Sequence, residues 1–199
     1  RTKGLSEESA HIPVTMDPSL RLSAETERFV AEIQKTHPFI GSAQLPVIAL
    51  VPFSNTLSVP RMSDIAQHIQ AEWINLGEAQ QRRVLHSSLL ASNIEHELHK
   101  FIAGELIISA SDRIDVLLAA SLASSNGIPL AGLVLTEHYA PNALVLDFCQ
   151  TAIKQGLPIL QTPLSTFETA QQLSNLSNEI PVDDTERAEQ VTRFVSSHI

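Results

Sequence analysis

The sequence has 199 residues, of which 43% are hydrophobic and 18% are charged, and this balance excludes a disordered chain. Its 13 basic and 22 acidic residues give a formal net charge of −9. Because Lys and Arg form no cluster, the sequence favours neither nucleic acid nor an anionic membrane as a partner. The single cysteine, Cys149, excludes an intrachain disulfide framework and a cysteine-rich zinc site, and suits a reducing cytoplasm.

Neither the start of the chain nor its longest uncharged stretch has the pattern of a targeting signal. Because the sequence begins with Arg1, we expect a fragment of a longer protein. Its first residues are charged and polar with no apolar stretch behind them, unlike a signal peptide. The uncharged stretch 116–136 is long enough to cross a bilayer, but Asn-Gly-Ile-Pro at its middle is typical of a turn, so two elements of a soluble protein are expected.

The first third of the chain predicts two helices around one buried strand. A helix is expected over residues 23–36, with Ser23 as its N-cap. The continuous apolar run at 45–51 is typical of a strand buried on both faces. A second helix is predicted over 63–76, with Gly77 as its left-handed cap.

From about residue 83 the sequence alternates between strand and helix patterns. Strands are predicted at residues 83–89, 105–110, 130–136 and 159–161. Helices are predicted at residues 92–103, 112–126, 141–155, 165–173 and 185–197. This alternation indicates an α/β fold with a predominantly parallel sheet and right-handed crossovers. The last helix follows Asp183 with Glu186 three residues on, a capping-box pattern.

Two further patterns refine this interpretation. Residues 126–130 and 155–159 match in type, each giving a helix end, a glycine C-cap and a proline that enters a strand. The helix after Asp112 is apolar nearly all round, which is typical of a helix buried on more than one side. We therefore expect this helix to pack on the sheet and also on another domain or subunit.

Common catalytic motifs are absent from the sequence. It has no complete phosphate-binding P-loop, no dinucleotide-binding glycine fingerprint and no serine-hydrolase elbow. His96 and His99 are three residues apart, and we interpret them as part of a solvated helix face rather than a surface metal site. Cys149 lies within a predicted helix and is interpreted as a buried structural thiol. No catalytic residue, metal ligand or cofactor is predicted for this chain.

Polar side chains follow two consecutive buried strands, at the edge where ligands bind in open parallel sheets. These candidate ligand-binding residues are Ser111, Asp112, Arg113, Thr136, Glu137 and His138. Arg113 favours a small anion, Glu137 opposes one, and His138 would help only when protonated. The alternative, favoured by the sequence alone, is that Ser111 or Asp112 is a helix cap and Arg113 its surface neighbour.

At these residues the chain resembles a known family. The segments 45–52, 104–117, 156–158 and 179–187 are similar to the amino-terminal, non-catalytic half of long bacterial phosphate acetyltransferases. The last segment, Glu-Ile-Pro-Val-Asp-Asp-Thr-Glu-Arg, is long and specific. In that family a P-loop domain resembling dethiobiotin synthetase comes first, a DRTGG domain second and the acetyltransferase domain last.

The resemblance implies a domain organisation and assigns the candidate site. Residues 1–77 would be the end of a truncated P-loop-like domain, and residues 82–199 would be a DRTGG regulatory domain. Asp112 and Arg113 match the Asp-Arg of the family, and Thr136 matches its threonine. Glu137 and His138 stand where two glycines are usual.

The resemblance further implies a regulatory and oligomerisation role within a cytoplasmic phosphate acetyltransferase, which interconverts acetyl-CoA plus phosphate with acetyl phosphate plus CoA. The fragment alone would be inactive, would self-associate, would adjoin the catalytic domain of the same polypeptide and would respond to a small-molecule effector, such as the pyruvate or NADH sensed by some members. Two alternatives stay open: a free-standing metabolite-sensing DRTGG-type module, and a small enzyme using Asp112, Glu137 or His138 as acid and base.

Overall fold

The computed structural model describes residues 24–40, 42, 54, 57, 59–137, 141–177 and 179–197. Backbone contacts divide the chain into two units, one of Arg1–Pro52 with Thr192–Ile199 and one of Phe53–Val191. In the first unit, α1 (Ala24–Thr36) confirms the predicted helix, whereas the strand predicted at 45–51 lies outside the described residues. None of the helices in the described ranges is both long and apolar enough to cross a membrane.

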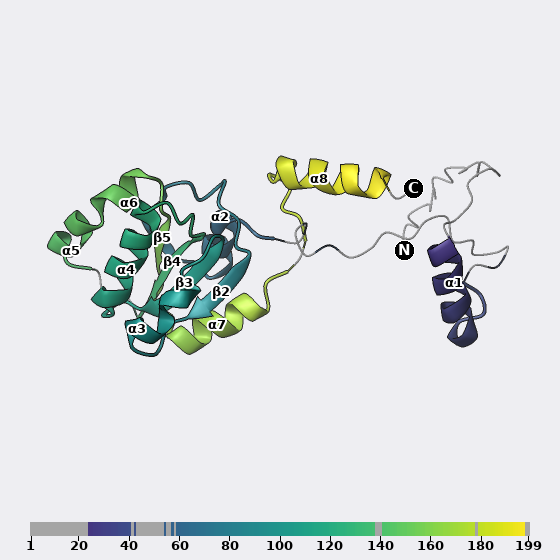
Figure 1. Ribbon diagram of the computed structural model, residues 1–199, viewed down its shortest axis with the longest axis horizontal. Helices are drawn as coiled ribbons and strands as arrows, with labels where there is room; N and C mark the ends of the chain where they lie inside the picture. Colours follow the sequence, from purple (N-terminus) through teal and green to yellow (C-terminus); the bar gives the residue numbers. More distant parts are fainter. Residues whose placement is uncertain are drawn as a thin grey trace, which may run out of the picture. The chain divides into compact units, whose positions relative to one another are not determined.

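The second unit is built on a five-stranded sheet with the order β1-β5-β4-β3-β2 (Figure 1). The strands are β1 (Glu72–Asn75), β2 (His86–Leu89), β3 (Glu105–Ala110), β4 (Gly132–Thr136) and β5 (Ile159–Gln161). β2, β3, β4 and β5 are mutually parallel, and β1 joins the edge antiparallel to β5. The predominantly parallel α/β sheet is therefore confirmed.

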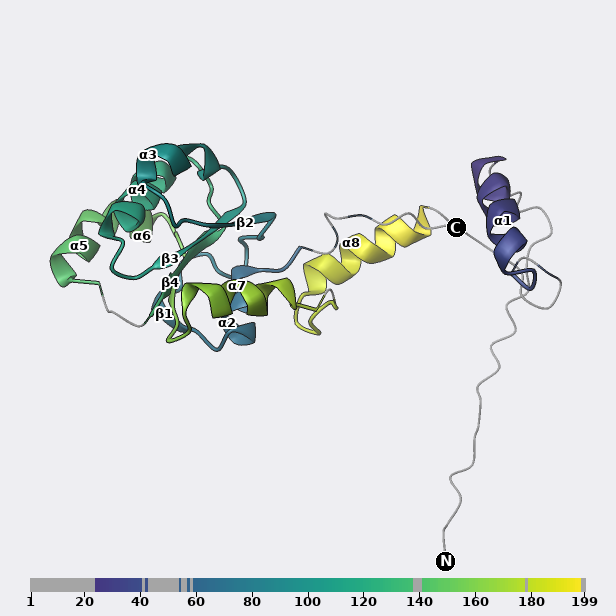
Figure 2. The ribbon, with the colours of Figure 1, turned by 90° about the horizontal axis from the view of Figure 1, so that it is seen from below.

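Helices cover both faces of this sheet (Figure 2). One face carries α3 (Ile94–Glu97), the 3₁₀ helix η2 (Leu98–Lys100), α4 (Ile114–Ser125), α5 (Ala143–Phe148) and α6 (Gln150–Lys154). The other carries α2 (Met62–His68) and α7 (Thr166–Ser174), and α8 (Thr185–Ser196) ends the described chain. Successive residues of β3 face opposite sides, so Ile107 packs in the core under α4, while Leu106 and Ile108 pack under α2.

The helix predicted over 63–76 is wrong in its second half. α2 ends at His68, Gln70 adopts a left-handed φ of 50°, and residues 72–75 form β1 instead. The reason is tertiary, because the backbone of this segment pairs with β5. Gly77 does have a left-handed φ of 47°, but it follows a strand and lies against Gly156, where an added Cβ would stand 2.3 Å from the carbonyl oxygen.

Three other predicted helices differ in detail. The helix expected over 92–103 is confined to α3 and η2, whose first turn is capped by the Asn93 side chain. The one expected over 141–155 is split into α5 and α6 at Cys149, whose N–H bonds the carbonyls of both Val145 and Leu146. The Cys149 thiol is free and buried, as predicted. The cap of α8 is Asp184 rather than Asp183, since the Arg187 N–H donates to Asp184 Oδ1 at 3.2 Å.

The segment 76–85 runs along the amino edge of the sheet from β1 to β2. Hydrogen bonds join it to the turns before three strands: Glu78 N–H to the Gly156 carbonyl (2.8 Å), Arg82 Nη1 to the Leu130 carbonyl, and Leu85 N–H to the Gly104 carbonyl (2.9 Å). Together with β1, the segment 76–85 belongs to the same compact unit as the rest of the sheet. The domain boundary expected between residues 77 and 82 stays a prediction.

Candidate functional site

The carboxyl edge of the sheet gathers the ends of β3 and β4. These strands are parallel neighbours with Ala110 opposite Thr136, so the turns that follow them leave the sheet side by side. The predicted residues Ser111, Asp112 and Arg113 follow β3, and Glu137 follows β4. His138 lies outside the described residues.

Ser111 and Thr136 are joined in this edge. The Ser111 N–H donates to the Thr136 carbonyl at 3.0 Å, and the Ser111 hydroxyl donates to the same oxygen. Thr136 is fully buried, and its hydroxyl shares a hydrogen bond of 2.8 Å with Thr166 in the first turn of α7. These two residues therefore tie β3, β4 and α7 together, which is a structural role.

Arg113 lies at the N-cap position of α4, where no side-chain cap hydrogen bond forms, so neither Ser111 nor Asp112 acts as the expected cap. Its guanidinium makes two bonds to the Asp115 carboxylate, at 2.9 and 2.8 Å, and one to the Ser92 carbonyl at 2.9 Å. The bond from Arg113 lowers the pKa of Asp115, and the bond to Asp115 raises the pKa of Arg113. An anion bound by Arg113 would have to compete with this carboxylate.

Glu137 has a backbone conformation that L-residues rarely adopt. Its φ is 70°, its side chain is exposed, and its N–H donates to the Leu164 carbonyl at 3.0 Å. Glycine takes a left-handed φ without a steric penalty, so the local backbone geometry itself favours glycine here.

Two buried polar atoms on the α4 side of this edge were not singled out from the sequence. Ser109 Oγ on β3 and Gln161 Nε2 on β5 are buried and make no hydrogen bond within the described structure. Buried polar groups without partners are costly, and they are the groups that a polar ligand or a water molecule satisfies. A sequence signal did exist, because both residues occupy inward positions of otherwise apolar strands.

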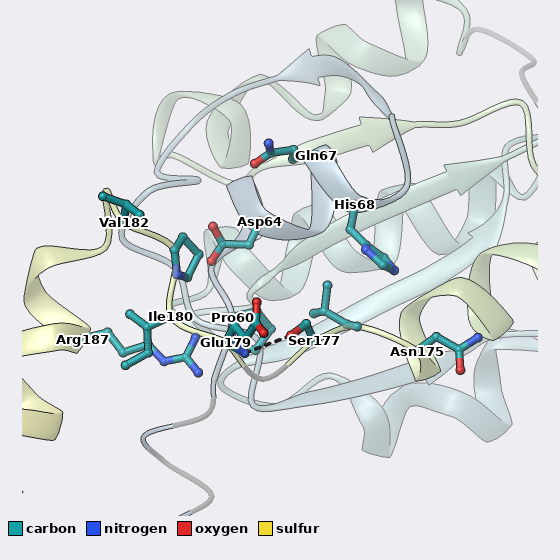
Figure 3. A pocket seen from close by; sticks show the side chains of 12 residues that line it. Pro60, Asp64, Gln67, His68, Asn175, Ser177, Glu179, Ile180, Val182 and Arg187 are labelled. Carbon is teal, nitrogen blue, oxygen red and sulfur yellow. Dashed lines mark hydrogen bonds between the residues drawn. The ribbon is translucent and has the colours of Figure 1, made fainter. Parts of the chain in front are cut away.

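A cavity of about 590 Å³ lies on the opposite side of the sheet (Figure 3). Its walls come from α2, the segments 175–177 and 179–182, and Arg187, and labelled side chains such as Asp64, His68 and Glu179 surround it. His68 Nε2 lies 2.9 Å from the Gln172 carbonyl. The volume is that of a small-molecule site. The sequence pattern does not reveal this cavity, because α2 and the facing segment are more than 100 residues apart in the chain.

Beside this cavity lies a buried ion network, which we call the Asp184 network, formed by Asp184 with Arg61, Arg83 and Asp64. Asp184 is 2% exposed and receives two bonds from the Arg83 guanidinium, at 2.5 and 2.8 Å. Arg61, itself buried, bonds Asp64 at 2.7 Å and lies 3.7 Å from Asp184. The bonds from Arg83 hold the pKa of Asp184 below its ordinary value. The network joins the start of α8 to α2 and to the segment before β2.

The same corner also buries Arg187, on the first turn of α8. Its Nε donates to the Leu57 carbonyl at 2.6 Å, and burial lowers its pKa. Asp184 and Arg187 both fall within the segment 179–187, which carries part of the family resemblance. The sequence did not reveal which residues Asp184 and Arg187 contact. Within the described ranges, no group of three or more His, Cys, Asp or Glu residues is placed to hold a metal ion.

The geometry thus defines an α/β domain with a predominantly parallel sheet, a polar carboxyl edge and a buried ionic corner. The sequence profile of the DRTGG domain matches residues 64–176. The chain belongs to the DRTGG domain family.

Comparison with curated proteins finds phosphate acetyltransferases. The chain is 69% identical over 199 residues to that of Acinetobacter baylyi, 37% identical over 171 residues to that of Pseudomonas putida and 39% identical over 158 residues to that of Escherichia coli. These alignments cover 100%, 86% and 79% of this chain. The matched part is 28%, 25% and 22% of the respective relatives, so the chain spans about a quarter of their length.

Among solved structures, the chain is similar to the CBS and DRTGG domains of the regulatory region of Clostridium perfringens pyrophosphatase, crystallised with its activator diadenosine tetraphosphate. The similarity covers 82% of this chain and 70% of that one, with 16% sequence identity and a TM-score of 0.48.

Proposed function

We propose that this chain is the regulatory, non-catalytic portion of a phosphate acetyltransferase, the enzyme that interconverts acetyl-CoA plus phosphate with acetyl phosphate plus CoA. The observation that carries the proposal is the 69% identity over the whole chain to a phosphate acetyltransferase of which it spans 28%. The catalytic domain would belong to the same polypeptide, in the cytoplasm, and residues before the DRTGG domain would be the end of a P-loop-like domain. Self-association of the parent enzyme forms part of the proposal.

The polar carboxyl edge is the proposed effector site. Ser111, Asp112 and Arg113 follow β3 at this edge, Glu137 follows Thr136 at the end of β4, and His138 comes next in the sequence. Arg113 supplies the cation that would favour a small anionic metabolite, and the unpartnered Ser109 and Gln161 atoms lie at the same edge. Because Asp115 already holds Arg113 through two bonds, we expect weak binding that displaces Asp115.

The alternative of a small enzyme has little support from the described residues. Asp112 and Glu137 are both exposed, and neither makes a described contact with the other or with a nucleophile. Thr136 and Ser111 are committed to the structural bonds of the sheet edge. The other alternative, a free-standing metabolite-sensing DRTGG module, shares the effector site and differs in having no acetyltransferase to regulate.

Two assays test the proposal. The isolated chain should form no acetyl-CoA from acetyl phosphate and CoA, whereas turnover comparable to a full-length enzyme at equal molarity would refute a non-catalytic role. In the full-length enzyme, Arg113→Ala should abolish the response to pyruvate and NADH and leave turnover without effectors nearly unchanged. Arg113→Lys, which keeps the charge and loses the two-bond geometry, should give an intermediate response.

The second assay also separates the alternatives. If deleting residues 59–197 from the full-length enzyme leaves its effector response intact, the regulatory role is wrong. An isolated chain that binds an effector, in a reading frame that encodes no acetyltransferase, would favour the free-standing sensor.

A further inference from the structure

α4 has two apolar faces, and one of them lies on the surface. Val116, Leu117 and Ala120 are fully buried against the sheet. On the opposite side Ile114, Leu118 and Leu122 follow at intervals of four and are 44%, 37% and 64% exposed. Residues at this spacing share one helix face. The helix therefore presents a second apolar stripe away from the core.

The neighbouring helix α5 also exposes large apolar side chains. Leu144 and Phe148, again four residues apart, are 68% and 80% exposed. α5 lies beside α4 on the same side of the sheet, as both views show (Figures 1 and 2). We call Ile114, Leu118, Leu122, Leu144 and Phe148 the α4–α5 face.

The charge around this face selects its partner. Between Arg113 and Lys154 the sequence has no Lys or Arg. Of the two acidic residues on α4 and α5, Asp115 is neutralised by Arg113 of the same chain, and Asp147 is the other. Helices that bind anionic membranes or phosphates carry Lys and Arg beside their apolar side chains, so a lipid surface does not fit. A protein surface that is also apolar and lacks charge fits this face.

The area also fits a protein partner. With about 200 Å² for each large side chain, the five residues at these exposures present roughly 600 Å² of apolar surface. The largest apolar patch on a typical monomer reaches about 300–600 Å², and a standard interface takes about 800 Å² from each partner. The face together with its polar rim therefore matches one side of a dimer interface.

We propose that the α4–α5 face is the surface through which two copies of this chain associate about a twofold axis. A twofold axis places the same patch on both subunits, so an apolar stripe whose helices carry no Lys or Arg meets its own copy. The interface deepens the proposed oligomerisation role and rests on it.

The test is sedimentation of the 199-residue chain and of two matched variants. The wild type should be a dimer at micromolar concentration. Phe148→Glu should weaken dimerisation about 100-fold or more, because it buries an unpaired charge in the interface. Phe167→Glu is the control, since Phe167 is 73% exposed on α7, which covers the other face of the sheet. This variant should remain dimeric, and circular dichroism should show both variants folded.

Several outcomes overturn the proposal. The first two are a wild-type chain that is monomeric at 100 µM and a Phe148→Glu variant that stays as dimeric as wild type. The third is a loss of dimer in Phe167→Glu equal to that in Phe148→Glu. The fourth is binding of the wild-type chain to phosphatidylglycerol vesicles that Phe148→Glu abolishes. If Phe148→Glu fails because it unfolds, Leu122→Ser repeats the test with a smaller change. None of these results bears on the effector response of the full-length enzyme, so the regulatory role and this interface can fail separately.

Discussion

Asp184→Asn is the substitution that most directly tests how this domain is held together. Asp184 accepts two bonds from Arg83, lies 3.7 Å from Arg61, and caps α8 through the Arg187 N–H. Asparagine has the same size and is an equally good N-cap. The substitution therefore removes a charge and leaves both shape and helix capping in place.

The structure sets the size of the effect. Breaking a buried ion pair by removing one partner costs about 3–5 kcal/mol, because the other charge is left uncompensated. Two features reduce this figure: the Arg83 side chain is 22% exposed, and Arg61 keeps its bonds to Asp64 and Asp183. We expect a loss of about 3 kcal/mol in the free energy of unfolding, a large part of the 5–15 kcal/mol typical of a domain.

Urea unfolding followed by tryptophan fluorescence measures this loss. The chain has a single tryptophan, Trp73 on β1, so the signal reports the unit that contains Asp184. Asp183→Asn is a matched control, because its side chain is 69% exposed and it bonds the same Arg61. Exposed pairs contribute about 0–1 kcal/mol, so the control should lose at most about 1 kcal/mol. Equal losses in the two variants, or a loss below about 1 kcal/mol for Asp184→Asn, would refute the reasoning.

The stability difference between wild type and Asp184→Asn should also depend on pH. The folded-state pKa of Asp184 lies below its ordinary value of 3.8 because of the bonds from Arg83. A carboxyl with a depressed folded pKa contributes stability that is present above its unfolded pKa and is lost as pH falls through the folded value. The gap in stability between wild type and Asp184→Asn should therefore stay constant from pH 7 to about 5 and close below about pH 4. A gap that widens on acidification would contradict this sign.

Parts of the fold could be predicted from sequence because their cause is local. The strands at 105–110 and 159–161 have the predicted bounds, since a short, largely apolar run that follows a glycine turn leaves few other structures. The glycines of the two matching segments behave alike, with Gly127 at φ 91° and Gly156 at φ 85°, each ending a helix. These strand bounds and helix ends follow from backbone sterics, which depend on residue type and can therefore be predicted from the sequence.

Other parts could not be predicted because their cause is distant in sequence. Residues 72–75 carry a pattern compatible with a helix, and it is pairing with β5, more than 80 residues away, that makes them a strand. The cap of α8 was displaced by one residue because Asp183 and Asp184 are chemically identical. Arg83, 101 residues away, selects the second of them.

The candidate site shows the same division. Parallel topology alone predicted that the residues after β3 and β4 would share an edge. It could not show that Thr136 would be buried against Thr166 or that Asp115 would hold Arg113, because those contacts depend on side-chain packing after the backbone is placed. The edge is therefore more thoroughly hydrogen-bonded, and Arg113 less available, than the sequence suggested.

Three further predictions are tested by the same urea assay. Gln161→Met removes a buried Nε2 that has no partner, so stability should stay equal or rise by about 1 kcal/mol; a clear loss would mean that the amide is satisfied by water or ligand. Gly77→Ala should cost about 3 kcal/mol, because its Cβ would stand 2.3 Å from the Gly156 oxygen, whereas Gly127→Ala, with open space around it, should cost about 1 kcal/mol; equal costs would contradict the close approach. Glu137→Gly should raise stability by about 1 kcal/mol, because a left-handed φ costs an L-residue about 1–2 kcal/mol and glycine loses part of that gain through its freer unfolded state. The exposed Glu137 side chain makes no hydrogen bond that the structure describes and that the substitution would remove. If Glu137→Gly instead lowers stability, the Glu137 carboxylate contributes more to the free energy of unfolding than the left-handed backbone costs. Interactions of the glutamate side chain would then stabilise this turn.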